Sequence, residues 1–183
     1  MSYQPTPREK ARALRLPSAE WRRYLADPQM QASYHAKICR SAGECWFWTG
    51  ALSESGHGRL KVPAHLGTRT VASHVYGYQL VYGALVLDAS GVPVIRHRCD
   101  NASCHRPSHW VTGAPRDNTA DYQARRDDPL SPLSDKRGAR GRERAIRAAI
   151  LQAQAEGRDV DRAIRLAIET GMPGVQDTLP IGR

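Results

Sequence analysis

The residues best suited to chemistry gather in one stretch of this sequence, residues 92–121. Two cysteines and a histidine, Cys99, Cys104 and His109, follow one another there at intervals of five residues. Thiolate sulfur and imidazole nitrogen are ligands that Zn²⁺ prefers, and a structural zinc ion takes four such ligands in a tetrahedron. The spacing therefore predicts three ligands of a structural zinc site, with a fourth supplied from elsewhere in the chain.

Two more polar residues, His97 and Asn118, lie outside this ligand set. His97 follows the apolar residues 92–95, which predict a short strand, and Asn118 falls in the first turn of a helix expected to open near Asp117. A neutral imidazole can act as a general base, and an amide oxygen can bind a hard cation. A strand-end histidine satisfied by a backbone carbonyl is the simpler interpretation. The position of His97 between a metal knuckle and a helix start favours the functional one.

The stretch resembles the HNH endonucleases, also called His-Me finger or ββα-metal endonucleases. The resemblance is closest to their zinc-stapled subgroup, which is similar to the His-Cys box homing endonucleases. The matching residues are His97, Cys99, Asp100, Asn101, Cys104, Pro107, His109, Trp110, Gly113, Asp117, Asn118 and Asp121. The upstream segments CWFWTG, GHGRLKV and SHVYGYQLVYG also fit the order of that subgroup. The resemblance covers residues 45–126, under half of the chain.

The resemblance implies an α+β fold, in which a small zinc-stapled ββα-metal (His-Me finger) core occupies residues 45–128. Around it the sequence predicts a basic helical N-terminal arm (1–44), a linker containing Pro, Gly and Ser (129–143) and a helical C-terminal extension (144–183). Apolar residues at helical spacing predict two helices in the extension. A degenerate helix-turn-helix DNA reader is one interpretation of that pair, and we favour dimerisation or packing against the core.

Three local patterns predict elements within these segments. Asp27 before Pro28 predicts the start of a helix that runs to about residue 38. Alternation predicts a strand over residues 58–62. Ser73 is expected to cap a helix that ends at Gly83. The core face of that helix is expected to carry Val75, Tyr78, Gln79 and Tyr82.

The resemblance also implies roles for individual residues. It places the strand that opens at Cys45 beside the knuckle, so Cys45 is the expected fourth zinc ligand, with Cys39 as the alternative. It implies that His97 is the general base and that Asn118 binds a catalytic Mg²⁺, for which Mn²⁺ can substitute. An arginine from the hairpin region steadies the cleaved phosphate in such enzymes, and Arg59 is the local candidate, although an exposed strand arginine has equal weight.

One position departs from the pattern of the family. Many HNH enzymes carry an acidic residue just before the base histidine, as a second ligand of the catalytic ion, and this chain has Arg96 there. The departure predicts a single protein ligand for that ion, as in the His-Cys box enzymes. It bears on metal affinity rather than on the class of reaction.

The charge of the chain indicates its partner. A net charge of +9 and a pI near 9.8 favour a polyanion, with double-stranded DNA as the expected one. The side chains expected to contact DNA are Arg59, Lys61, Arg96, Arg98, His74 and Arg116, and for His74 a structural hydrogen bond has at least equal weight. No apolar run approaches membrane-spanning length and no signal-peptide pattern opens the chain. We therefore expect a cytoplasmic protein with reduced thiols, and a phage gene in a bacterial host is one source that fits.

The function that these features imply is a metal-dependent DNA endonuclease that leaves 5′-phosphate and 3′-hydroxyl ends. Two alternatives stay open: a non-catalytic zinc DNA-binding module, and an accessory protein of phage DNA packaging. Homing, restriction, packaging and defence are all compatible roles. Cutting both strands usually takes two active sites, so a homodimer is compatible with the sequence as well.

Overall fold

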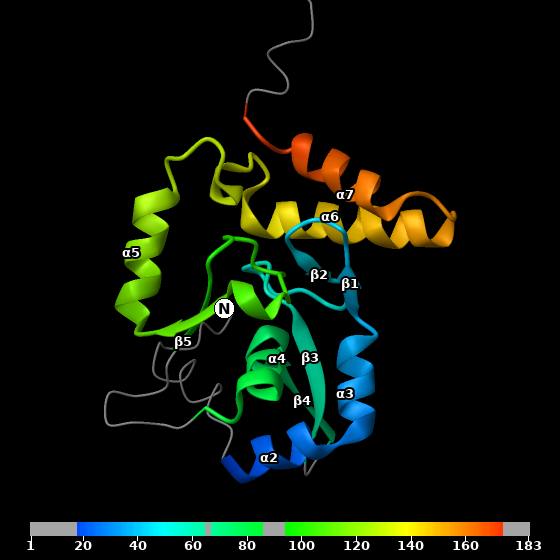
Figure 1. Ribbon diagram of the computed structural model, residues 1–183, viewed down its shortest axis with the longest axis vertical. Helices are drawn as coiled ribbons and strands as arrows, with labels where there is room; N and C mark the ends of the chain where they lie inside the picture. Colours follow the sequence, from blue (N-terminus) through cyan, green and yellow to red (C-terminus); the bar gives the residue numbers. More distant parts are fainter. Residues whose placement is uncertain (1–17, 65–66, 86–93, 174–183) are drawn as a thin grey trace, which may run out of the picture.

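The computed structural model describes residues 18–64, 67–85 and 94–173, which form a mixed α+β fold (Figure 1). Three two-stranded antiparallel sheets lie in the described residues, β1–β2, β3–β4 and β5–β6. The basic residues 8–15 of the predicted arm and the turn expected at 88–91 lie outside the described residues. None of the described helices is long and apolar enough to cross a membrane.

One core forms between the N-terminal helices and the β3–β4 hairpin. Helices α2 (Ser18–Ala26) and α3 (Pro28–His35) pack with α4 (Ser73–Tyr82) and with strands β3 (Arg59–Ala64) and β4 (Gly67–Ala72). Asp27 caps α3 as predicted, because its carboxylate accepts from the backbone N–H of Gln29 at 2.8 Å. The helix ends at His35, before the predicted residue 38, because Ile38 already belongs to strand β1 (Ile38–Arg40).

Helix α4 differs from the prediction at its start and in its buried face. Ala72 holds the N-cap position, and the hydroxyl of Ser73 lies 2.8 Å from Nε2 of His105 instead of capping the helix. Tyr76 is fully buried, whereas Tyr82 is 54% exposed. The predicted core face was therefore wrong in part: Gln79 is buried, but Val75 and Tyr78 are only partly covered. Gly83 ends the helix as predicted, with a φ of 93°.

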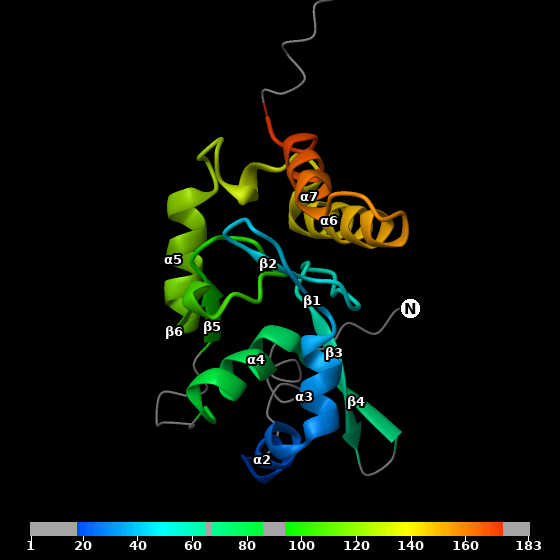
Figure 2. The same ribbon diagram turned by 45° about the vertical axis from the view of Figure 1, so that its right-hand side comes forward.

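The stretch with the predicted chemistry folds as strand, strand, helix. Strand β5 (Val94–His97) pairs with β6 (Trp110–Gly113), with His97 opposite Trp110, and helix α5 (Pro115–Arg125) follows. The knuckle between β5 and β6 joins strand β2 (Trp46–Trp48) through backbone hydrogen bonds. Figures 1 and 2 both show α5 standing beside the β5–β6 hairpin. Its start at Pro115 lies two residues before the predicted opening at Asp117.

Helices α6 (Gly138–Ala155) and α7 (Val160–Glu169) stack on each other and cover the knuckle. Ile146, Ile150 and Ile164 share a second buried cluster with Cys45 and Cys104. Of the two favoured interpretations, dimerisation and packing against the core, these contacts show the packing. Residues 138–143, which the sequence assigned to a linker, are helical.

Candidate functional site

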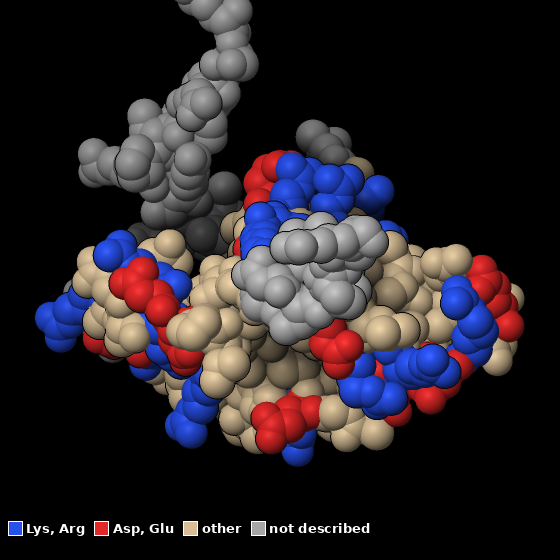
Figure 3. Space-filling view, turned by 90° about the horizontal axis from the view of Figure 1, so that it is seen from above, with Lys and Arg blue, Asp and Glu red and all other residues tan. Residues whose placement is uncertain are grey.

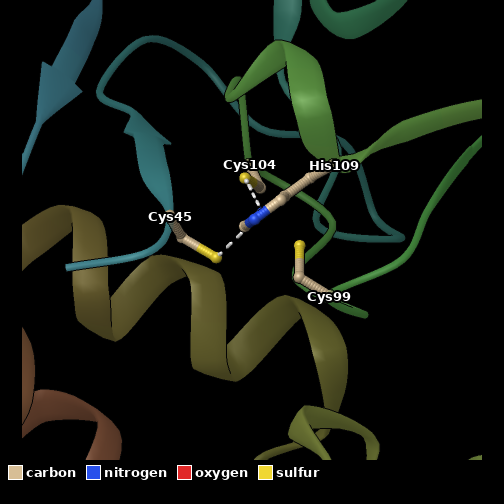
Figure 4. A group of neighbouring side chains, drawn as sticks. All are labelled: Cys45, Cys99, Cys104 and His109. Atoms are coloured by element: carbon tan, nitrogen blue, oxygen red, sulfur yellow. Dashed lines mark hydrogen bonds between the residues drawn. The ribbon is translucent and has the colours of Figure 1, made fainter.

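Four side chains converge where β2, the knuckle and helix α6 meet (Figure 4). Cys45, Cys99, Cys104 and His109 each offer one ligand atom, and these atoms all lie within 4.8 Å of one another. Nδ1 of His109 lies 3.7 Å from Sγ of Cys45 and 3.5 Å from Sγ of Cys104. The predicted ligand set, with Cys45 as its fourth member, is the set that the fold brings together. Cys39 is buried on β1 and is not part of this group.

The four residues fit a closed zinc site. Bond lengths of about 2.3 Å to sulfur and 2.0–2.1 Å to nitrogen in a tetrahedron put a thiolate sulfur and an imidazole nitrogen about 3.6 Å apart. The two separations in the structure, 3.7 and 3.5 Å, agree with this value. Contact with Cys104 and Cys99 raises the pKa of the Cys45 thiol. Neighbouring sulfurs thus oppose ionisation of Cys45. A dication at the centre would offset this opposition, because zinc binds cysteine as the thiolate.

Backbone geometry holds the ligands in place. Asp100, directly after Cys99, has a φ of 53° and turns the chain back, a conformation that Asp adopts more easily than most residues. The N–H of Cys104 donates to the carbonyl of Asn101 at 3.1 Å. The short 3₁₀ helix η1 (Pro107–His109) then presents the His109 ring. These turns close the knuckle without a large apolar core.

A second layer of polar contacts reaches the site from α6. Asn101 donates from Nδ2 to Sγ of Cys45 at 3.3 Å, and its Oδ1 accepts from Nε of Arg142 at 3.0 Å. Arg142 is 4% exposed and also pairs with Asp135 at 3.3 Å. Ser103 donates to the buried carboxylate of Glu143. Sequence reasoning missed Arg142 and Glu143, which lay in the expected linker.

His97 lies at the end of β5 with its ring held by the knuckle. Its Nε2 is 3.0 Å from the main-chain oxygen of Cys104, which also accepts from Nε1 of Trp110 at 3.2 Å. A carbonyl only accepts, so Nε2 carries the proton and Nδ1 keeps its lone pair. Only 9% of the residue is exposed, and burial lowers its pKa, so the ring is neutral at neutral pH.

Two more histidines lie beside His97. Ring centroids are 5.8 Å apart for His57 and His97 and 5.0 Å apart for His74 and His97. Burial, with a smaller contribution from His97, lowers the pKa of His57 to about 4 and the pKa of His74 well below its ordinary value. Nδ1 of His57 is 3.0 Å from the hydroxyl of Ser55. His57 was missed, although its place between two glycines next to Arg59 was a signal that could have found it.

Arg96 lies on the face of the β5–β6 hairpin against which α5 packs, and Asn118 lies in the first turn of that helix. Asn118 is exposed, and no hydrogen bond joins its side chain to His97 among the described residues. Successive side chains of a strand point to opposite faces, and Arg96 points to α5, where it pairs with Asp121. Asp121, the partner of Arg96, lies one helical turn from Asn118 on α5.

The other predicted DNA contacts divide by exposure. Arg59 and Lys61 alternate with buried residues on β3, as the predicted alternation requires, and both are exposed. Arg98 and Arg116 are exposed too. His74 is 7% exposed, so the structure gives it a supporting place inside the fold and not a surface one. Arg96 is held by its ion pair with Asp121.

Comparison with known proteins found two curated relatives, both from Escherichia phage T7. The chain is 35% identical to Protein 7.7 over 78 residues, which is 43% of this chain and 54% of that protein. It is 30% identical to Protein 2.8 over 85 residues, 46% of this chain and 53% of that protein. The chain thus spans about half the length of the curated relatives it matches. No protein-family model and no solved structure matches the chain.

Proposed function

We propose that this protein is a metal-dependent DNA endonuclease with a zinc-stapled ββα-metal core, and that it is encoded by a phage. One observation carries the proposal: a neutral imidazole, His97, is oriented by the main-chain oxygen of a residue in the zinc ligand set. Zinc binding by itself requires no such histidine. The order β5, β6, α5 and the exposed amide of Asn118 agree with this assignment.

The reaction is hydrolysis of a phosphodiester. His97 takes a proton from a water molecule through Nδ1, since Nε2 already donates to Cys104. The water oxygen bonds to phosphorus, and the bond from phosphorus to the 3′ oxygen breaks. The products are a 5′-phosphate and, after protonation by solvent, a 3′-hydroxyl. Such general-base catalysis contributes roughly two to four orders of magnitude in rate.

Asn118 and Arg59 are the residues that help to stabilise the negative charge on the phosphate. The exposed amide oxygen of Asn118 is a hard ligand of the kind that Mg²⁺ or Mn²⁺ accepts. A bound divalent ion would supply charge neutralisation at the phosphate and at the leaving oxygen. Arg59, exposed on β3, adds a positive charge from the hairpin. Zinc in the four-ligand site has a structural role, because a closed shell leaves no position for substrate.

The test is plasmid cleavage by the purified full-length protein. Supercoiled plasmid should be nicked or linearised only when Mg²⁺ or Mn²⁺ is added, and end mapping should find 5′-phosphates. His97→Ala should lower the rate of cleavage by at least about a hundredfold, while zinc content and DNA binding are unchanged. His35→Ala, which changes an exposed histidine on α3, serves as the matched control. Cutting by His97→Ala at the rate of the control would end the assignment.

A second candidate is a non-catalytic zinc DNA-binding module. The observation that favours it is the burial of His97, which has only 9% of its surface exposed. This candidate predicts tight, salt-sensitive DNA binding with no metal-dependent nicking, and equal behaviour of the wild type and His97→Ala. The same plasmid assay therefore separates the two candidates.

A further inference from the structure

We propose that helix α6 provides a second phosphate-binding surface, which holds duplex DNA beside the cleavage site. The surface is an open groove of about 520 Å³ between α6 and residues 51–52. Three arginines line it, Arg140, Arg144 and Arg147, together with three alanines, Leu52 and no acidic residue. The inference rests on the proposed function in one respect, namely that the partner is DNA.

The three arginines share one face of the helix, at positions i, i+4 and i+7. Like charges at this spacing destabilise a helix unless something compensates them. Arg144 is exposed and has no ion-pair partner among the described residues. Arg140 pairs with Glu54, whose side chain is 82% exposed, and such a surface pair is weak and easily exchanged for another anion. The face is therefore positively charged and short of fixed counter-charge.

Arg147 has a different part in the groove, because it fixes the wall. Its Nε donates to the carbonyl oxygens of Thr49 and Gly50, both at 2.8 Å. These bonds tie α6 to the segment between β2 and β3, and Figure 2 shows that segment lying directly under the helix. The groove is thus preformed, which lowers the cost of ordering it on binding.

The wall of the groove is bonded to the segment that leads to the proposed cleavage site. Ala51 lines the groove, and its carbonyl accepts from the backbone N–H of Arg59 at 2.8 Å. Leu52, also in the lining, bridges to Gly58, and the loop between them carries His57, whose ring is 5.8 Å from that of His97. A DNA backbone held at Arg59 on β3 can therefore follow the β2–β3 loop to the arginines of α6.

Net charge alone does not select this surface. On the face in Figure 3, lysine and arginine side chains lie in several groups with acidic side chains beside them. At the far end of α6, Arg158 pairs with Glu156. A phosphate binds better to guanidinium groups that have no carboxylate competing for them. Binding there also releases counterions from the DNA. Among acidic residues, only Glu54 is seen to compete for an arginine of the groove in the described part of the chain.

The experiment measures binding of the full-length protein to a short fluorescein-labelled duplex without added Mg²⁺, as salt is varied. Arg140→Gln with Arg144→Gln should lower the slope of log K against log salt by about two, one for each lost phosphate contact. Glu54→Gln should tighten binding, because it removes the carboxylate that competes for Arg140. Arg158→Gln removes one positive charge outside the groove and should leave the slope near that of the wild type.

The outcomes separate the groove from the nuclease proposal. A lower slope for the double variant, with unchanged zinc content and melting temperature, supports the groove even if plasmid is never cut. An unchanged slope, a loss of equal size in Arg158→Gln, or no DNA binding by the wild type overturns it, even if plasmid is cut. Weaker binding by Glu54→Gln would also count against the groove, because removing a competitor cannot weaken a phosphate site.

Discussion

The main-chain oxygen of Cys104 lies 3.0 Å from Nε2 of His97, so one residue offers its sulfur to the metal group and its carbonyl to the imidazole. This arrangement couples the two halves of the candidate site. A shift of the knuckle would move the carbonyl and turn the ring with it. Metal binding by the four-residue group and orientation of the proposed base would therefore depend on the same short turn.

The first prediction concerns the metal group itself. Cys104→Ser replaces a soft ligand with a poor one and should abolish the bound zinc, with a collapse of the thermal unfolding transition. Cys39→Ala is the matched control, because Cys39 is also a buried cysteine but lies outside the group. It should keep one zinc per chain and lose about 1 kcal/mol of stability. Zinc analysis and a melting curve decide between these outcomes, and loss of zinc from Cys39→Ala alone would reverse the assignment.

Much of the candidate site could be predicted from the sequence because its residues are close along the chain. Regular spacing of Cys99, Cys104 and His109 selects a metal knuckle before any fold is known. The apolar run before His97 predicts a strand, which the structure contains from Val94 to His97. Cys45 needed the resemblance, because spacing alone could not separate it from Cys39.

The parts that sequence reasoning missed depend on contacts between distant segments. His57 meets His97 through the folding of the β2–β3 loop, and Arg142 reaches Asn101 across 41 residues. A segment rich in Gly and Arg looks like a linker when its partners are unknown. In the fold, Arg142 pairs with Asp135 and donates to Asn101, and these contacts offset the cost of burying its charge. The buried face of helix α4 was predicted wrongly in part because the helix is covered on more than one side. A single apolar stripe therefore does not mark its core face.

The second prediction concerns the support of the zinc group by α6. Asn101→Ala removes the N–H that donates to Cys45 and leaves Nε of the buried Arg142 without its partner. Loss of such outer contacts typically weakens metal affinity by about 10–100-fold. Competition with a chelating dye should show this loss. Asn118→Ala should leave zinc affinity unchanged and remove metal-dependent cleavage, so equal effects of the two variants on zinc would contradict the assigned roles.

The third prediction concerns the pH dependence of stability. Burial raises the pKa of Glu143 to about 7 from an ordinary value of 4.5. The folded protein thus binds this proton more tightly than the unfolded chain does. The resulting stabilisation is full below pH 4.5, falls as the pH rises, and is gone above pH 7. Its full size is at most on the order of 3 kcal/mol.

Glu143→Gln tests this linkage. The amide stays neutral and can still accept from Ser103, so it keeps the contact without the titration. Denaturant unfolding of both proteins from pH 5 to pH 8, at one fixed zinc concentration, gives the difference in free energy of unfolding at each pH. The wild type should lose stability relative to Glu143→Gln as the pH rises. A difference that stays constant over this range would show that the carboxyl does not titrate in the fold.

The fourth prediction concerns Gly77, where helix α4 passes close to its neighbours. A Cβ at this position would lie 2.8 Å from the ring of Trp110 and closer still to the hydroxyl of Tyr34. Replacing a helical glycine with alanine normally stabilises by about 0.5–1 kcal/mol, so the sign of the effect is informative. We expect Gly77→Ala to destabilise by about 1–3 kcal/mol, because both rings are buried and packed. A fall of roughly 2–4 °C in melting temperature for each kcal/mol would report it.

Gly43→Ala is the matched control for this prediction. Its new Cβ meets only the Ser41 hydroxyl at 3.6 Å, so its melting temperature should barely change. A higher melting temperature for Gly77→Ala would contradict the close approach of α4 to its neighbours.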